Sequence, residues 1–160
     1  MSSNENWPMR SGPKPETTRQ IPHSQLTQHG PDKVIAKLHD WCFALPDVKN
    51  EHSGISVPGA RALVLHEECD CNPDAFMVGR EFAHIHPYPD NGSMHVKLSA
   101  EDARDVIAAG WGEDHFLVTL GHYPPGLIMV FSPRSDEELE VVKRIVALSH
   151  AFATRSGRGQ

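Results

Sequence analysis

The chain has 160 residues, of which 39% are hydrophobic and 22% charged, and its formal net charge is −6. This length is enough for one domain that buries most of its surface without a disulfide or metal staple. The acidic balance, without any lysine and arginine cluster, argues against a nucleic-acid partner, and no apolar run of about 18 residues predicts a membrane span. We expect a soluble, globular protein.

The N-terminal segment, residues 1–30, is polar and rich in proline. It carries too few large apolar side chains to offset the entropy of ordering them, so its composition predicts a flexible tail. The segment also lacks the basic and then apolar pattern of a secretory signal. Because the three cysteines are odd in number, they indicate reduced thiols and a cytoplasmic location.

The first helix is expected to begin at Pro31 and to end at Leu45-Pro46. Its apolar residues recur at helical spacing: Val34, Ile35, Leu38, Trp41 and Cys42. Residues 47–53 are polar and predict a connection. Extended segments follow at residues 55–57, 61–66, 76–78, 82–86 and 94–98.

A short middle helix is expected from Ser99 to Gly110, because Ser99 and Asp102 resemble a capping box. Strands are predicted at 111–120 and 127–131, and a long C-terminal helix begins at Ser135 with Glu138 at the reciprocal capping position. These elements predict an α+β fold in which one mostly antiparallel sheet carries an N-terminal, a middle and a long C-terminal helix. The expected domain covers residues 31–153, between flexible tails at 1–30 and 154–160.

Histidine is the unusual feature, with 11 residues in the chain. His84 and His86 share one face of a strand, because side chains alternate along it. In the next strand, His95 and Lys97 lie opposite the apolar Met94, Val96 and Leu98. If residues 87–92 close a hairpin, three imidazoles converge on one surface.

Three interpretations of this surface remain open. The histidines are polar residues on a solvent-facing sheet, or they present three nitrogens, from His84, His86 and His95, to a divalent metal such as zinc, iron, manganese or copper. In the third interpretation they act as general base and hydrogen-bond donors towards an organic substrate. Glu81 and Lys97, on the same two strands, are then candidates for binding that substrate.

A second group of candidates follows at residues 110–115. Alternation places Trp111, Glu113 and His115 together, so that the carboxylate can fix the imidazole tautomer and the indole can form a wall for an aromatic substrate. The alternative is a core tryptophan beside a surface ion pair. Arg134 is a candidate for a substrate carboxylate or enolate oxygen, or a surface partner of nearby carboxylates.

Other chemistries lack support in the sequence. Cys69 and Cys71 form one Cys-x-Cys without a second pair, which matches no common zinc spacing. The glycines form no phosphate-binding loop, and no Gly-x-Ser-x-Gly elbow indicates a serine hydrolase.

Taken in order, several motifs of this chain resemble the fungal-luciferase-like (luciferase-domain) family over about residues 45–153. They are Ile-Ser-Val-Pro-Gly-Ala (55–60), Glu-Phe-Ala-His-Ile-His-Pro (81–87), Gly-Ser-Met-His (92–95), Gly-Trp-Gly-Glu-Asp-His (110–115) and Ser-Pro-Arg-Ser-Asp-Glu-Glu-Leu (132–139). The family includes the fungal luciferase, which adds O2 to a hydroxylated styryl-pyrone without an organic cofactor.

The resemblance implies a small oxygenase that acts with O2 on an enolisable aromatic or polyketide-like molecule. A base among His84, His86, His95 and His115 would deprotonate that substrate, and Glu113 would support it. No organic cofactor is implied, and a divalent metal remains the alternative. The competing function is a non-catalytic module that binds a small ligand or a metal.

Overall fold

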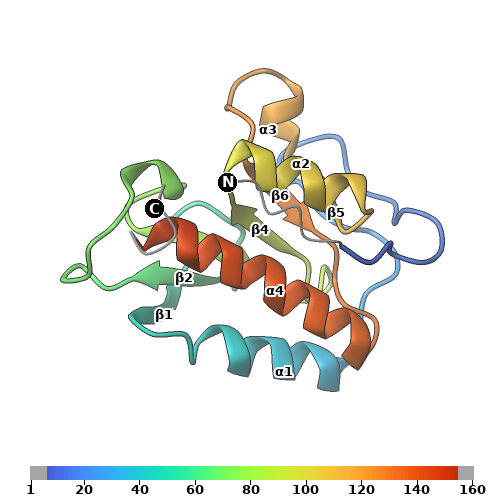
Figure 1. Cartoon of the computed structure of the whole chain (residues 1–160). Coiled ribbons are helices and arrows are strands. Elements are labelled where there is room, and N and C mark those ends of the chain that lie inside the picture. Colours follow the sequence, from blue (N-terminus) through green and yellow to red (C-terminus); the bar gives the residue numbers. More distant parts are fainter. Residues whose placement is uncertain (1–6, 155–160) are drawn as a thin grey trace.

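The computed structural model describes residues 7–154. Within this range the strands form one sheet in the order β1-β2-β3-β4-β6-β5, and every neighbouring pair is antiparallel (Figure 1). The strands are β1 (Val48–His52), β2 (Arg61–Leu65), β3 (Glu81–Ile85), β4 (Met94–Lys97), β5 (Gly112–Asp114) and β6 (Leu127–Val130). The predicted α+β fold with an antiparallel sheet is confirmed.

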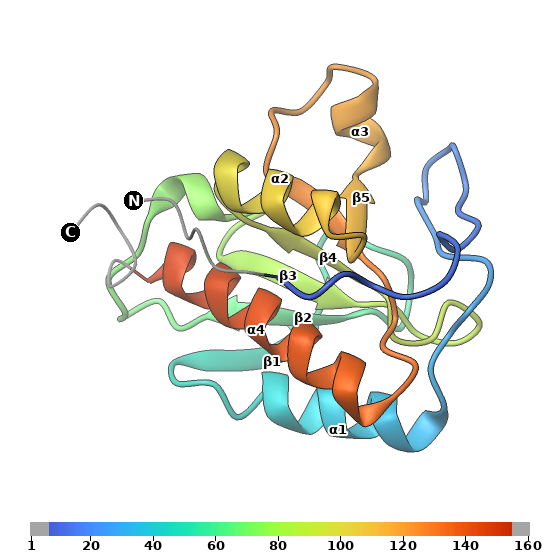
Figure 2. The same ribbon diagram turned by 45° about the vertical axis from the view of Figure 1, so that its right-hand side comes forward.

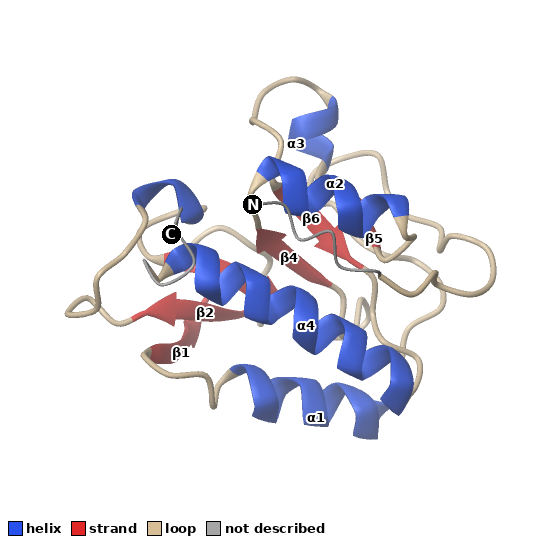
Figure 3. Ribbon diagram, in the orientation of Figure 1, coloured by secondary structure: helices blue, strands red, loops and turns tan. Residues whose placement is uncertain are grey.

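Three helices cover one face of the sheet and enclose the core. They are α1 (Asp32–Cys42), α2 (Ala100–Ala108) and α4 (Asp136–Ala153). Figure 2 shows α4 crossing the sheet with α1 beside it, and Figure 3 shows α2 on the same side. Two short helices, η1 (Pro73–Ala75) and α3 (Phe116–Thr119), lie in connections. Among the described residues, no helix has the length and apolarity needed to cross a membrane.

The predicted helix caps are present. Ser99 Oγ accepts a hydrogen bond from Asp102 N at the start of α2, and Ser135 Oγ accepts one from Glu138 N at the start of α4. Each cap satisfies a backbone donor that the first helical turn leaves free. The apolar stripe of α4 is buried as its spacing predicts: Leu139, Val142, Ile145 and Val146.

Three of the predicted strands differ from the structure. The first strand is β1 (Val48–His52), not residues 55–57, because an edge strand needs only backbone pairing with β2 and tolerates an exposed polar sequence. Residues 76–78 contribute only an isolated bridge between Val78 and Glu81. The predicted strand 111–120 is β5 followed by α3, since the His115 side chain caps α3 and ends the extended backbone.

The N-terminal segment also differs from its prediction as a flexible tail. Residues 7–30, here called the N-terminal strap, lie against the folded domain, with His23 and Gln25 almost fully buried. Gln25 Oε1 accepts from Ser132 N, and Trp111 Nε1 donates to Pro8 O. Trp7 packs against the core, and polar groups make the other contacts just named, which composition alone does not predict. The predicted tail residues 1–6 and 155–160 lie outside the described residues.

Candidate functional site

The sheet face opposite α1 and α4 carries the histidines that the strand pattern singled out. His84 on β3 pairs directly with His95 on β4. His86 follows β3, where His86 N donates to Ser93 O and the chain turns back through Gly92, whose φ is +93°. The predicted hairpin therefore brings three imidazoles together, and their rings are buried rather than solvent-facing.

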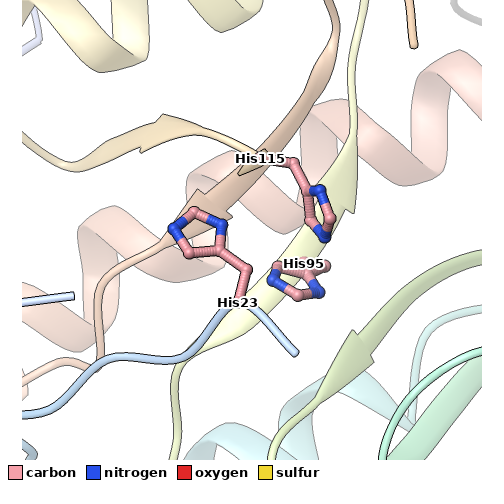
Figure 4. Close-up of side chains that lie close together, drawn as sticks. All are labelled: His23, His95 and His115. Atoms are coloured by element: carbon pink, nitrogen blue, oxygen red, sulfur yellow. The ribbon is translucent and has the colours of Figure 1, made fainter. Parts of the chain in front are cut away.

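Two further imidazoles complete the cluster, one from the strap and one from the residue after β5. His95 lies at the centre, with its ring centroid 4.4 Å from those of His86 and His115, 4.9 Å from His84 and 5.9 Å from His23. Figure 4 shows His23 reaching from the strap to His95 and His115. We call these five residues the histidine cluster.

A cavity of about 290 Å³ adjoins this cluster. All five imidazoles contribute to its lining, and the rest of the wall is mainly apolar: Ile21, Pro22, Ile55, Val57, Met77, Leu117, Tyr123 and Leu127. Small-molecule sites commonly combine apolar walls with a few convergent polar groups. No lysine, arginine or carboxylate belongs to this lining within the described part of the chain.

Glu81 reaches the cluster because of an irregularity in β3. Opposite Leu63 and Val64 of β2, strand β3 carries one extra residue, Phe82. This β-bulge turns Glu81 towards His84, although simple alternation would place the two on opposite faces. Nδ1 of His84 then lies 2.8 Å from Glu81 Oε2.

The other side of the His84 ring contacts the central imidazole, with His84 Nε2 3.0 Å from His95 Nδ1. Glu81 is held in turn by Ser53 Oγ, which donates to Oε2, and by Gly54 N, which donates to Oε1. A carboxylate and two imidazoles therefore form one continuous hydrogen-bonded chain that ends beside the cavity.

His86 is oriented by a separate acidic group. Its Nδ1 lies 2.8 Å from Ser93 Oγ and 3.1 Å from Asp90 Oδ2, while Ser93 Oγ donates to Asp90 Oδ1. Asp90 also accepts from Gln25 N of the strap and lies 3.1 Å from His29 Nε2. The turn that places His86 is thus tied to the strap.

Glu113 has a different partner from the one we predicted. It lies 2.5 Å from His23 Nε2 and 2.6 Å from Lys14 Nζ. His115 Nδ1 instead accepts a hydrogen bond from Leu117 N. The prediction that Glu113 orients His115 assumed a continuous strand, and that strand ends at Asp114.

Burial decides the protonation of the imidazoles. It lowers the pKa of His84, with Glu81 opposing the effect, and it lowers the pKa of His95 still further, reinforced by the surrounding imidazoles. Burial and His23 lower the pKa of His115 to about 4. These rings are therefore neutral at pH 7.

The two carboxylates remain ionised. Burial alone would raise their pKa values, but hydrogen bonds outweigh it. The groups that lower the pKa of Glu81 are His84, Ser53 and the Gly54 amide. Hydrogen bonds with His23, Lys14 and Thr17 lower the pKa of Glu113 to about 2.

Two sets of histidines could hold a metal ion, since their ligand atoms lie within 4.8 Å of one another. In the set His23, His95 and His115, both nitrogens of His23 are engaged, by Phe116 N and Glu113. In the set His84, His86 and His95, both nitrogens of His84 are likewise engaged, by Glu81 and by His95. The Nδ1 atoms of His84 and His86 face carboxylates, an arrangement typical of ligating histidines.

Three other predicted site residues do not line the cavity. Trp111 packs in the core, and Arg134 forms an ion pair with Glu138. Lys97 donates to Asp74 O, and its Nζ lies 5.7 Å from the ring centroid of Tyr123, a residue that lines the cavity. The indole wall and the arginine contact therefore do not form, because each side chain has a structural partner elsewhere.

Sequence reasoning missed His23 and the cavity segment 55–57. His23 stands in a polar, proline-rich stretch that gives no periodic signal, and the sequence of residues 55–57 predicts a strand. The nearest signal was the excess of histidine over the whole chain. Only the tertiary path of the strap places His23 opposite His115, with 5.3 Å between ring centroids.

An α+β domain whose buried histidine cluster borders an apolar cavity has the features of a small-molecule-binding protein. Residues 79–149 match the Luciferase domain family, a range that includes four of the five histidines of the cluster. The chain is 36% identical to the luciferase of Neonothopanus nambi in an alignment that covers 96% of this chain. It is 29% identical to the luciferase of Armillaria ostoyae in an alignment that covers 95% of this chain.

These matches show that the chain is similar to the fungal luciferases, the family that its motifs resemble. The chain spans 63% of the length of these curated relatives. No solved structure matches it. Because the relatives align with about 95% of this chain, the similarity also extends into the strap, beyond the residues that carried the resemblance.

Proposed function

We propose that this protein is an oxygenase-type enzyme that binds an enolisable aromatic or polyketide-like molecule in the histidine-lined cavity and lets it react with O2. The cavity carries this proposal, because a largely apolar wall meets several neutral imidazoles there. The similarity to fungal luciferases supports O2 as the co-substrate.

The reaction with O2 requires two contributions from the protein. An acidic enol or phenol must lose its proton, and the resulting electron-rich anion must be held away from water while it passes electrons to O2. Neutral imidazoles can take the proton, and a ring that presents N–H can stabilise the anionic oxygen. Apolar walls exclude water and strengthen both interactions.

The cavity also limits the substrate. Since its lining contains no lysine or arginine among residues 7–154, it does not favour a phosphate or a free carboxylate. Its volume of about 290 Å³ suits one or two aromatic rings. A planar phenol or enolic pyrone matches both limits.

Oxygen uptake tests the function. The purified protein is mixed with a panel of enolic pyrones and phenols, and the same panel is given to His84→Ala/His86→Ala and to the control His52→Ala, which changes an exposed histidine. We expect catalysed uptake with at least one compound, reduced by about 100-fold or more in the double variant and unchanged in the control. Ligand binding without turnover of any compound would favour a binding module.

A further inference from the structure

One fully buried nitrogen of the cluster takes no part in the hydrogen bonds of the fold. His95 Nε2 is buried and lacks a hydrogen-bond partner among the described residues. A buried polar atom without a partner is destabilising, so native proteins rarely keep one without a functional reason. Because His95 borders the cavity, a bound molecule is the available partner.

The hydrogen-bond partners of the chain fix the hydrogen on each ring. Glu81 is ionised, so the 2.8 Å contact requires His84 to carry its hydrogen on Nδ1. Neutral His84 then has a bare Nε2, and the 3.0 Å contact requires His95 to donate from Nδ1. Neutral His95 is left with a lone pair on Nε2, the atom without a partner.

The facing imidazole has the opposite arrangement. His115 Nδ1 accepts from the backbone N–H of Leu117, which can only donate. Neutral His115 must therefore carry its hydrogen on Nε2. Its ring centroid lies 4.4 Å from that of His95, so a proton acceptor and a proton donor stand side by side at the cavity.

We propose that His95 is the catalytic base of the cavity, that Glu81 and His84 are positioning residues behind it, and that His115 donates a hydrogen bond to the anionic oxygen. This assignment rests on the proposed function. The substrate O–H bond breaks and an N–H bond forms on His95 Nε2. The Nδ1 hydrogen of His95 passes to His84 Nε2, which leaves an imidazolium beside the Glu81 carboxylate.

This relay explains why the Glu81 carboxylate contacts His84 and not His95. An imidazolium at His95 would be buried among other imidazoles, with the substrate anion but no protein carboxylate beside it. Moving the positive charge to His84 pairs it with Glu81, because buried charges are stable only when paired. The β-bulge at Phe82 that turns Glu81 towards His84 thus contributes to the chemistry.

A chromogenic phenol tests the assignment without O2 turnover. 4-Nitrophenol is colourless when protonated and yellow as phenolate, so its visible spectrum reports deprotonation when it binds anaerobically in slightly acidic buffer. We expect the wild-type protein to bind the phenolate. In His95→Gln the yellow form should be lost, and in Glu81→Gln its affinity should fall by about tenfold or more. The control His52→Gln should behave as wild type.

The outcomes separate the two proposals. If the wild type turns the probe yellow and folded His95→Gln does so equally, the base is another residue and the relay is wrong, while the proposed function stands. If the wild type binds only the protonated probe, the relay is overturned whether or not oxygen uptake is observed. A failure of oxygen uptake with all substrates, with phenolate binding intact, removes the oxygenase function and keeps the base.

A measurement on the wild-type protein avoids variants that fail to fold. Nitrogen-15 NMR of the imidazoles distinguishes a protonated from a bare ring nitrogen. We expect His84 and His95 to be neutral with hydrogen on Nδ1, and His115 to be neutral with hydrogen on Nε2. Hydrogen on Nε2 of His95, or a metal-bound nitrogen on His84 or His95, would overturn the assignment.

Discussion

The five imidazoles of the cluster differ in their hydrogen-bond partners, and those partners decide what each ring can do. His23 is engaged on both nitrogens, by Glu113 and by Phe116 N. His86, His95 and His115 each have an Nε2 atom without a protein partner in the described structure; that of His95 can accept a proton, and that of His115 carries one. Chemistry is therefore concentrated in three of the five rings.

Acid should destabilise the protein through these buried rings. The pKa of His115 is about 4 in the folded protein, against about 6.5 for an unfolded histidine. Between these values the unfolded chain binds more protons, so stability is complete above about pH 6.5 and falls as pH drops towards 4. The lowered pKa values of His84 and His95 act in the same direction.

Urea unfolding at several pH values measures this effect. For His115 alone, the loss between pH 6.5 and 4 should approach about 3 kcal/mol. His115→Gln should flatten the pH dependence, because the variant has no imidazole to protonate at this site. An unfolding free energy that stays constant over this range in the wild type would show that the rings are not held neutral.

Among the structural elements, the N-terminal strap joins the folded domain through polar contacts. His23 contributes to the cavity, and Gln25 connects the strap to the end of β6 through Ser132 N. Asp90 accepts from Gln25 N and also contacts His86, so the strap and the hairpin of the site share one carboxylate. These contacts predict that Gln25 is needed to hold the strap against the domain.

Gln25→Leu should release it. The substitution removes the acceptor of the Ser132 amide and leaves that donor buried, at a cost of about 1–3 kcal/mol. We expect faster amide hydrogen exchange over residues 16–30 and faster tryptic cleavage after Arg19. Gln20→Leu changes an exposed strap residue and serves as the matched control. Equal protection in wild type and Gln25→Leu would mean that other contacts hold the strap.

The elements also show what the sequence can predict. Alternation in β3 and β4 correctly joined His84, His86 and His95, because each strand buries one apolar face and the pattern fixes the register. Glu81 reached the same group only through a bulge, for which the sequence carries no periodic signal. The strap was missed for a related reason, since its attachment depends on tertiary hydrogen bonds that composition does not reveal.

For the molecule as a whole, the sheet separates two functions. The face under α1, α2 and α4 buries the core, while the opposite face carries the histidine cluster and the cavity. Mutations in the two places should therefore have separable effects. This separation also explains why Trp111 is absent from the cavity, since it packs with the core instead.

Ile145→Ala tests the separation. Ile145 is fully buried on α4, and its truncation should cost about 2–5 kcal/mol of unfolding free energy. Binding of 4-nitrophenol as phenolate should persist at temperatures where the variant is folded. The two effects are compared by urea unfolding and by the visible spectrum of the bound probe. If the loss of stability came with an equal loss of phenolate binding in the folded variant, the two faces would be coupled.

The central claim is that His95, whose Nε2 has no partner in the described structure, takes up a proton and does not hold a metal ion together with His84 and His86. Elemental analysis of the purified, untagged protein by plasma mass spectrometry, beside His84→Ala/His86→Ala, tests it most directly. We expect no stoichiometric transition metal in either protein. One equivalent of zinc, iron, manganese or copper in the wild type, lost in the double variant, would contradict the relay and assign these imidazoles to a metal centre.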